Sequence, residues 1–297
     1  ALATLNVIAS HKFTLSGTEI DATTITPDLI ANTLQEADGI EANVASGYHA
    51  IEFLLWGQDL NGTNPGAGNR PFTDFATDAT CTNGNCDRRA AYLQAATDLL
   101  VADLTEMAGN WEADGPARAA VTADPQKGIL AILTGMGSLS YGELAGERIK
   151  LGLMLNDPEE EQDCFSDNTH NSHFYDGLGI RNVYLGSFTR TDGSVLQGPA
   201  IADLVAAADP AVDMQLKSEL DASVAALQAM KDTGDAGQTF DTLIAPGNTQ
   251  GEAIIMAAVN ALVTQTASID RAVTALGLSK VEFEGSDSLD SPEAVFQ

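Results

Sequence analysis

Apolar residues recur along most of this chain at intervals of three and four positions, the spacing of one face of an α-helix. The clearest such segment runs from Asp87 to about Ala113, and the same spacing predicts helices over 125–155, 199–208, 210–232 and 248–276. Alternating patterns typical of strands are few. Only the first twenty-five residues, rich in Thr, Ser and Ile, are candidates for a short strand pair or an extended arm. The pattern therefore predicts an all-α fold class, built as bundles of long helices.

Residues with special backbone preferences mark the ends of the earlier helices. Thr26 stands directly before a proline, which predicts a helix start, and Asp38-Gly39 ends that helix after about residue 37. The next helix carries His49. Gly and Pro are frequent in residues 58–79, which predicts a loop. Because long structureless loops are uncommon in compact domains, this loop is expected to be functional or held in place.

The later half of the chain has its own stop signals. Asp157-Pro158 ends the helix over 125–155, and three glutamates follow it. Ser166 or Asp167 is expected to cap a helix that ends near residues 177–179. We expect residues 182–198 to be irregular and the acidic, Ser-rich tail after Ser279 to be loosely ordered.

These signals divide the chain into two predicted domains. Residues 1–160 form an N-terminal helical bundle that carries the His49 helix, and residues 161–297 form a C-terminal helical bundle. No internal repeat is visible at the level of residue identity.

The candidate chemistry starts with His49 and Glu52, which lie three positions apart in an otherwise apolar run. At helical pitch these two side chains share one face. No other charged residue occurs between Asn43 and Leu55, and apolar residues cover both sides of the helix, which predicts that it is buried. Burying an imidazole and a carboxylate costs free energy unless partners or a metal ion satisfy them. The pair is therefore either a hydrogen-bonded packing element or a metal-binding site.

Three ordered segments of the chain resemble one known family. They are Gly-Tyr-His-Ala-Ile-Glu-Phe-Leu-Leu-Trp-Gly-Gln-Asp-Leu from Gly47, Gly-Glu-Leu-Ala-Gly-Glu-Arg-Ile from Gly142, and Cys-Phe-Ser-Asp-Asn-Thr-His from Cys164, which is followed by Gly-Ile-Arg-Asn-Val-Tyr-Leu-Gly from Gly179. Their sequence, order and spacing resemble the imelysin family, also known as the iron-regulated protein A or M75 peptidase-like family. The resemblance runs from about Ile40 to the last long helix.

The resemblance implies a fold of two packed helical bundles. Members of the family usually carry several helices before the segment equivalent to Thr26, so the first bundle is either incomplete in this chain or completed by a separate fragment. The resemblance also implies that His49 and Glu52 bind a metal ion, with iron favoured and zinc as the alternative. It makes Arg148 a candidate buried partner for Glu52, and it adds Asp167 and His170 as supporting residues of the same site, in a cleft between the two halves.

Each supporting residue also has a purely structural interpretation. Arg148 can form an exposed ion pair with Glu143 or Glu147 on its own helix, and Asp167 can act as a helix cap. His173 forms a His-x-x-His pair with His170, which is either a metal-binding pair or an exposed polar face.

Two functions of different classes follow from the resemblance. The first is a periplasmic or cell-envelope protein that binds a metal ion, with iron favoured, for iron uptake or regulation, with envelope iron-uptake proteins as partners. The second is a metallopeptidase of the M75 type. The motifs His-Glu-x-x-His and His-x-x-Glu-His are both absent, so the sequence supports the peptidase less well.

Charge and cysteines complete the sequence-based interpretation. The chain has 42 acidic and 14 basic residues and a formal charge of −28, which excludes nucleic acid as a natural partner. No apolar run approaches the ~20 residues of a membrane span, and residues 1–10 do not resemble a signal peptide.

Cys81 and Cys86 bracket a turn-prone Thr-Asn-Gly-Asn segment, and they predict a small disulfide loop and an oxidising compartment. No second Cys or His pair completes a zinc site at this spacing. Cys164 is the remaining cysteine, and it is expected to be a buried thiol outside the disulfide.

Overall fold

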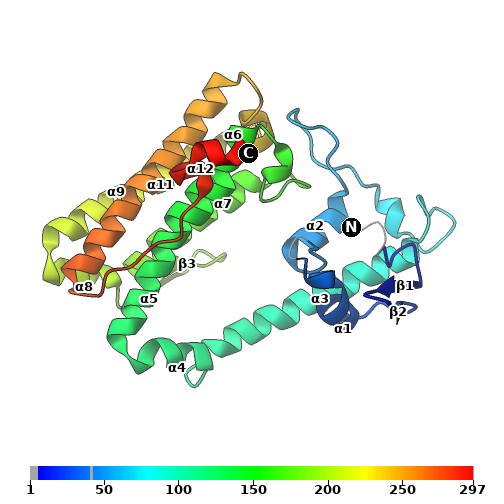
Figure 1. The fold of residues 1–297 in the computed structure, drawn as a ribbon, viewed down its shortest axis with the longest axis horizontal. Coiled ribbons are helices and arrows are strands. Elements are labelled where there is room, and N and C mark those ends of the chain that lie inside the picture. Colours follow the sequence, from blue (N-terminus) through cyan, green and yellow to red (C-terminus); the bar gives the residue numbers. More distant parts are fainter. Residues whose placement is uncertain (1–5, 41–42, 297) are drawn as a thin grey trace. The chain divides into compact units, whose positions relative to one another are not determined.

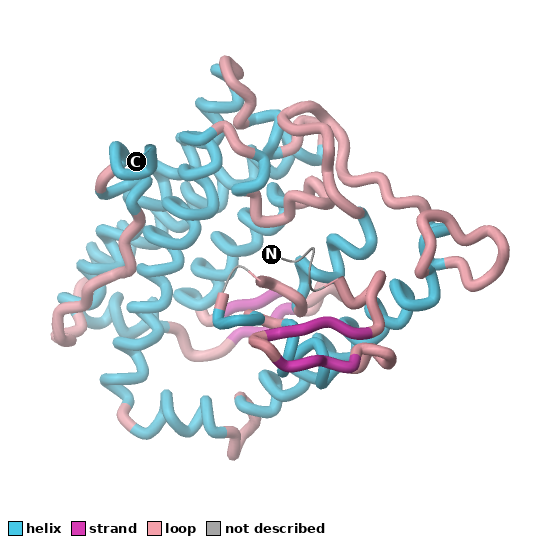
Figure 2. The backbone as a smooth tube through the Cα atoms, turned by 45° about the vertical axis from the view of Figure 1, so that its right-hand side comes forward, coloured by secondary structure: helices cyan, strands magenta, loops and turns pink. Residues whose placement is uncertain are grey.

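The all-α fold class is confirmed by a computed structural model, which describes residues 6–40 and 43–296 (Figure 1). Helix accounts for 63% of the structure and strand for 5%. Figure 2 shows that the strands form only short hairpins among the helices. The expectation that residues 1–10 form no leader concerns in part residues 1–5, which lie outside the described residues.

The chain divides into two compact units. Unit 1 consists of Ala1–Leu60 with Ala67–Arg118, and unit 2 consists of Asn61–Gly66 with Ala119–Gln297. The division of the sequence between residues 160 and 161 stays a prediction about domains. Along the sequence, unit 1 ends at Arg118, and residues 61–66 also belong to unit 2.

Unit 1 is built from a hairpin and a few helices. Its elements are β1 Lys12–Leu15, β2 Thr18–Asp21, α1 Pro27–Leu29, the π-helix η2 Ile30–Leu34, the short 3-10 helices η3 Ala37–Gly39 and η4 Phe72–Phe75, α2 Gly47–Trp56 and α3 Cys86–Asn110. The antiparallel pair β1–β2 is the strand pair that the first residues allowed. Thr26 caps α1 as predicted, because its hydroxyl accepts a hydrogen bond of 3.1 Å from the backbone N–H of Leu29.

A small apolar core and one buried arginine hold unit 1 together. Phe13, Ile30 and Ala96 belong to this core, which joins the hairpin and α1 to the first half of α3. The guanidinium of Arg88 is buried beside it and donates to the backbone carbonyls of Val7, Ala22 and Thr23. Because a buried carbonyl without a donor costs free energy, Arg88 stabilises the chain segments that precede α1.

Unit 2 is a helical bundle. The helix α4 Pro116–Ala123 leads into it, and its further elements are α5 Pro125–Ser138, the π-helix η5 Leu139–Lys150, α6 Leu151–Leu155, the 3-10 helix η6 Pro158–Glu160, α7 Thr169–Leu185, β3 Ser187–Thr189, β4 Val195–Gln197, α8 Ile201–Ala208, α9 Pro210–Asp235, α10 Phe240–Leu243, α11 Thr249–Ala275, α12 Asp287–Asp290 and the 3-10 helix η7 Pro292–Phe296. In Figure 1, α9 and α11 run side by side, and α7 and η5 pack against them. The predicted helix over 125–155 is one continuous run of α5, η5 and α6.

The core of this bundle is apolar and extensive. Leu144, Leu227, Phe240 and Leu262 are fully buried in one part of it, and Leu220 belongs to a second part. Among the described residues, α11 is the one helix long and apolar enough to cross a membrane by length and composition. Because 44% of its apolar window is buried inside the protein, and core helices pass the same test, this is weak evidence for a span.

Two predictions about unit 2 are wrong, and glycine packing explains the first. The helix α7 continues through Gly177 to Leu185, and a Cβ at Gly177 would clash with Cδ1 of Leu227. Gly177 therefore permits close helix packing and does not end the helix. The chain turns at Gly186, whose φ is +58°, and continues into the β3–β4 hairpin where an irregular segment was expected.

The described part of the tail, residues 280–296, is held against the bundle, contrary to the prediction. It lies along α5 and η5, where a Cβ at Gly142 would meet the carbonyl oxygen of Glu284 at 2.6 Å. Ser288 Oγ donates to the carbonyl of Gly146 at 3.0 Å, and Tyr141 OH donates to Asp290 at 2.7 Å. The acidic composition of the tail suggested disorder. These hydrogen bonds, and the close approach of the tail to Gly142, hold it in place.

Candidate metal-binding site

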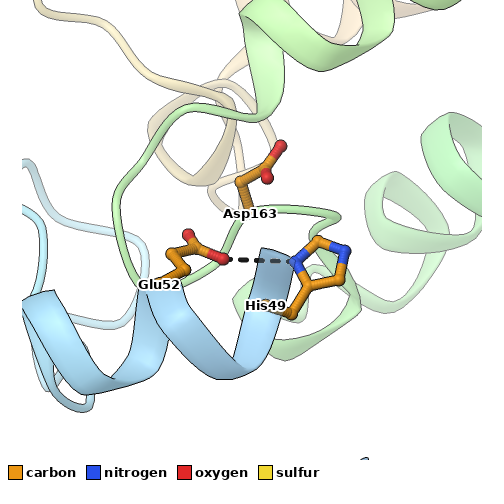
Figure 3. Close-up of side chains that lie close together, drawn as sticks. All are labelled: His49, Glu52 and Asp163. Carbon is orange, nitrogen blue, oxygen red and sulfur yellow. Dashed lines mark hydrogen bonds and ion pairs between the residues drawn. The ribbon is translucent and has the colours of Figure 1, made fainter. Parts of the chain in front are cut away.

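The helix α2 presents His49 and Glu52 on one face. Figure 3 shows the two side chains turned toward each other, with 3.2 Å between His49 Nδ1 and Glu52 Oε2. Helical pitch places residues i and i+3 side by side, so the Gly47–Gly57 motif dictates this pairing directly. Asp163, also drawn in Figure 3, belongs to unit 2.

The two groups differ in burial. Glu52 is buried, whereas the side chain of His49 is 44% exposed. The prediction of a buried helix is wrong for α2, since Tyr48, Leu55 and Trp56 are exposed while Glu52 and Leu54 are the buried members of the helix. The imidazole can therefore be reached from solvent, while the carboxylate is held within the protein.

The separation of the two ligand atoms fits one metal ion. Ligand atoms bound about 2.1 Å from an ion, at angles between those of octahedral and tetrahedral geometry, lie about 3.0 to 3.4 Å apart. The 3.2 Å between His49 Nδ1 and Glu52 Oε2 falls within this range. A nitrogen and oxygen donor pair suits iron and zinc alike, so the donor set does not choose between them.

The C-terminal end of α2 is tied to the loop that follows it. The backbone N–H of Arg70 donates to the carbonyl of Trp56 at 2.8 Å. The guanidinium of Arg70 lies 3.1 Å from the carboxylate of Asp74, which is itself buried. The predicted loop is therefore fixed to the site helix, which agrees with the expectation that a loop of this length is held in place.

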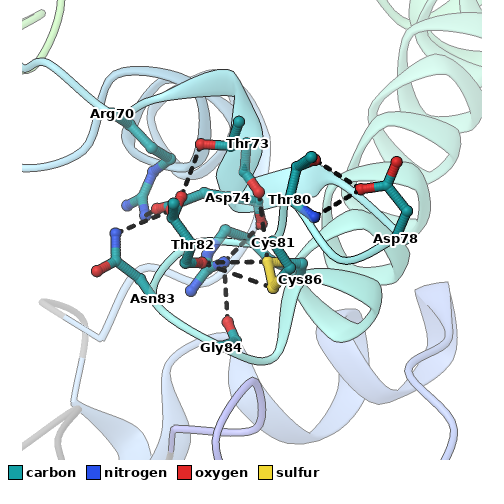
Figure 4. The surroundings of a disulfide bond; sticks show 11 residues. Arg70, Thr73, Asp74, Asp78, Thr80, Cys81, Thr82, Asn83, Gly84 and Cys86 are labelled. Carbon is teal, nitrogen blue, oxygen red and sulfur yellow. Dashed lines mark hydrogen bonds and ion pairs between the residues drawn. A yellow bond between two sulfur atoms is a disulfide. The ribbon is translucent and has the colours of Figure 1, made fainter.

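Asp74 is the centre of this loop and accepts hydrogen bonds from Thr82 at 2.7 Å and Asn83 at 2.8 Å (Figure 4). Burial favours a higher pKa for Asp74. The hydrogen bonds from Thr82, Asn83 and Arg70, together with the charge of Arg89, outweigh burial and lower the pKa below its ordinary value. The carboxylate of Asp74 is thus stabilised in its charged form.

The predicted disulfide between Cys81 and Cys86 is present directly after this loop, with a Cα–Cα distance of 6.0 Å (Figure 4). Cys86 is buried and begins α3. Cys164 is half-buried and takes no part in a disulfide. The pairing inferred from the Asn-Gly turn is therefore confirmed.

Unit 2 contributes the segment that precedes α7. Asp163 is half-buried, its backbone N–H donates to Thr169 Oγ1 at 3.0 Å, and its carboxylate accepts a hydrogen bond from Ser172 Oγ. Asp167 is buried with a left-handed φ of +55°, so it does not cap α7, and Asn168 occupies the N-cap position. Asp163 directly precedes the Cys164 motif and is not part of it, so no sequence motif pointed to this carboxylate.

His170 and His173 point into the interior of unit 2, so the interpretation as an exposed polar face is wrong. The ring of His170 packs against Gly234, and its Nε2 lies 3.3 Å from a carboxylate oxygen of Asp235. His173 is fully buried and meets the ring of Phe240 edge-on, with 5.1 Å between the ring centroids. Burial, and then the nearby charge of Arg148, lowers the pKa of His173 to about 3, so this imidazole is neutral at physiological pH.

Arg148 is exposed, and the expectation of a buried arginine is not met. Its guanidinium lies 3.5 Å from Glu143, which matches the structural interpretation of an ion pair on one helix. The pair lies in the π-helix η5, whose span Leu139–Lys150 contains the whole Gly142–Ile149 motif. Because π-helical turns occur frequently at functional sites, this widened turn distinguishes the motif from an ordinary surface helix. The approach of Arg148, Asp167 and His170 to His49 stays a prediction.

The fold and the pair on α2 define an all-α protein with a candidate metal-binding site on a helix face. A sequence model described as Imelysin, of peptidase family M75, matches residues 4–269 of the chain. The chain therefore belongs to the imelysin family, as its three motifs indicated. No curated protein matches the sequence.

Proposed function

We propose that this protein binds a metal ion, with iron favoured, through His49 and Glu52, and that it serves iron uptake or regulation in the periplasm or cell envelope. The observation that carries the proposal is the 3.2 Å separation of His49 Nδ1 and Glu52 Oε2 on a helix that holds no other charged group. Imidazole and carboxylate are ligands that iron accepts in proteins. The Cys81–Cys86 disulfide supports an oxidising compartment.

Two protein ligands rarely suffice for tight binding, so the proposal includes further donors from unit 2. Asp163 offers a carboxylate oxygen and is our candidate third ligand. Asp167, His170 and Arg148 are proposed as supporting residues that orient ligands or balance charge. With these groups, the protein would hold the ion by nitrogen and oxygen donors, and the ion would supply affinity for anionic or oxygen-rich species.

Titration of the purified protein with ferrous, ferric and zinc ions, followed by calorimetry, tests this proposal. We expect one site per chain, lost in His49→Ala and in Glu52→Gln and weakened in Asp163→Asn. His11→Ala is the matched control, because His11 is a histidine of the same unit outside the motif. Binding that survives both His49→Ala and Glu52→Gln would refute the site.

The second candidate function, a metallopeptidase, is favoured by the name of the family whose sequence model matches. A catalytic zinc usually has three protein ligands and a water, and the motif supplies two. We therefore expect little turnover of unstructured peptide substrates by pure protein. Robust cleavage that is lost in both His49→Ala and Glu52→Ala would make the peptidase the leading function.

A further inference from the structure

The helix α3 carries two separate apolar faces. Tyr92, Ala95, Ala96 and Leu99 pack against the core of unit 1. The second face, here called the α3 stripe, consists of Leu100, Val101, Leu104, Met107, Ala108 and Trp111. At the helical repeat these six residues fall within an arc of about 120° that adjoins the core face, and they are separated from the core residues along the helix.

The α3 stripe is open to solvent. Val101 is 58% exposed, Met107 59% and Trp111 54%, and Leu104 is exposed as well. Figure 1 shows the second half of α3 running away from α1, α2 and the β-hairpin of unit 1. An exposed apolar row of this length on a polar helix is typical of a surface that binds a partner.

Carboxylates border the stripe on both sides. On α3, which ends at Asn110, the helical repeat places Asp98 along one border and Asp103 along the other. No Lys or Arg occurs between Asp98 and Asp114. A partner must therefore bring apolar side chains for the stripe and positive charges for both borders.

The same charges disfavour a second copy of this chain. Two α3 stripes packed together would place acidic borders against acidic borders, on molecules that each carry a net charge of −28. Anionic lipid surfaces are disfavoured for the same reason. We infer that the α3 stripe docks a cationic amphipathic helix of a partner protein, laid lengthwise with its apolar face on the stripe and its Lys or Arg side chains against the acidic borders.

A fluorescence titration of the whole chain tests this inference. The chain has two tryptophans, so Trp56→Phe leaves Trp111 as a reporter within the stripe. The probes are two synthetic helical peptides with the same Leu and Ala face, one bordered by Lys and the other by Glu. We expect the Lys peptide alone to bind, with a blue shift of Trp111 emission and an affinity that falls as salt rises.

Variants of exposed residues test binding by the stripe without removing residues of the core. We expect Leu104→Asp to weaken binding of the Lys peptide about tenfold or more, as for an anchor residue. Ala102→Asp is the matched control, because Ala102 is exposed on α3 outside the stripe, and it should bind as before. The double change Asp98→Lys with Asp103→Lys should reduce the preference for the Lys peptide.

Several results would overturn the inference. Equal binding of both peptides would show an unspecific apolar surface, and binding of neither would show that the stripe takes no helix. A homodimer in sedimentation that dissociates in Leu104→Asp would assign the stripe to a second copy. An equal Trp111 shift with neutral phospholipid vesicles would assign it to a membrane.

Discussion

The two units of this protein reach stability by different means. Unit 2 buries long rows of leucine and isoleucine between α7, α9, α11 and the α5–η5 run. Unit 1 has a smaller apolar core, and it adds the Arg88 contacts to backbone carbonyls, the Asp74 network and a disulfide. Specific polar contacts therefore order unit 1 in regions that helix packing does not cover, and this unit carries His49 and Glu52.

Tryptophan fluorescence distinguishes the unfolding of unit 1 from that of unit 2. Both tryptophans, Trp56 and Trp111, lie in unit 1. Tryptophan fluorescence during unfolding in urea therefore reports on unit 1, whereas far-UV circular dichroism reports on the helices of both units.

The largest effect is expected from a cavity in the core of unit 2. Leu220→Ala should lower the free energy of unfolding by about 3 kcal/mol, because Leu220 is fully buried. The loss should appear in the circular dichroism transition and leave the tryptophan transition in place. The control is Leu204→Ala, also in unit 2 but exposed, for which we expect a change within about 0.5 kcal/mol. Equal losses for the two variants would show that unit 2 does not depend on core packing.

The Asp74 network should control the stability of unit 1. Asp74→Asn removes a buried charge that faces Arg70, so the tryptophan transition should lose about 2 kcal/mol. The pKa of Asp74 is lowered in the folded protein, so its contribution is present above the unfolded pKa near 3.9 and is lost as the pH falls below it. The wild-type protein should therefore lose stability in unit 1 below about pH 4. A variant with the same acid sensitivity as the wild type would contradict this role.

Removing the disulfide should give an effect of similar size. Cys81 and Cys86 are separated by five positions, and closing so small a loop contributes about 2 kcal/mol through the unfolded chain. The double variant Cys81→Ser with Cys86→Ser should shift the tryptophan transition by this amount. Cys164→Ser is the control and should leave that transition unchanged, since Cys164 belongs to unit 2 and is outside the disulfide. A larger loss in the control would contradict the assignment.

The sequence predicted the long helices well because their packing is periodic. The helix α9 was expected over 210–232 and spans Pro210–Asp235, and α11 was expected over 248–276 and spans Thr249–Ala275. Gly177 was misinterpreted because a glycine required by close packing and a glycine that ends a helix are identical in sequence. The ordered tail was missed because its partners, such as Gly146, lie more than a hundred positions away.

The part of the candidate site that lies within one helix was predictable from the sequence. The i and i+3 spacing of His49 and Glu52 determines their pairing within one helix turn. The exposure of α2 was not predictable, because an apolar helix does not reveal how many neighbours cover it. Asp163 had no periodic or motif signal of its own. Any role of Asp163 as a ligand depends on contacts with residues distant in sequence. That role stays a proposal.

The most direct test of the account is a crystal of the full chain grown with iron and examined by anomalous scattering. We predict a peak within about 2.3 Å of a ring nitrogen of His49 and a carboxylate oxygen of Glu52, since metal–ligand bonds of this kind are near 2.1 Å. The Glu52→Gln crystal, grown in the same way, should lack this peak. A wild-type crystal whose iron lies away from His49 and Glu52, with these two side chains still hydrogen-bonded to each other, would contradict the central claim.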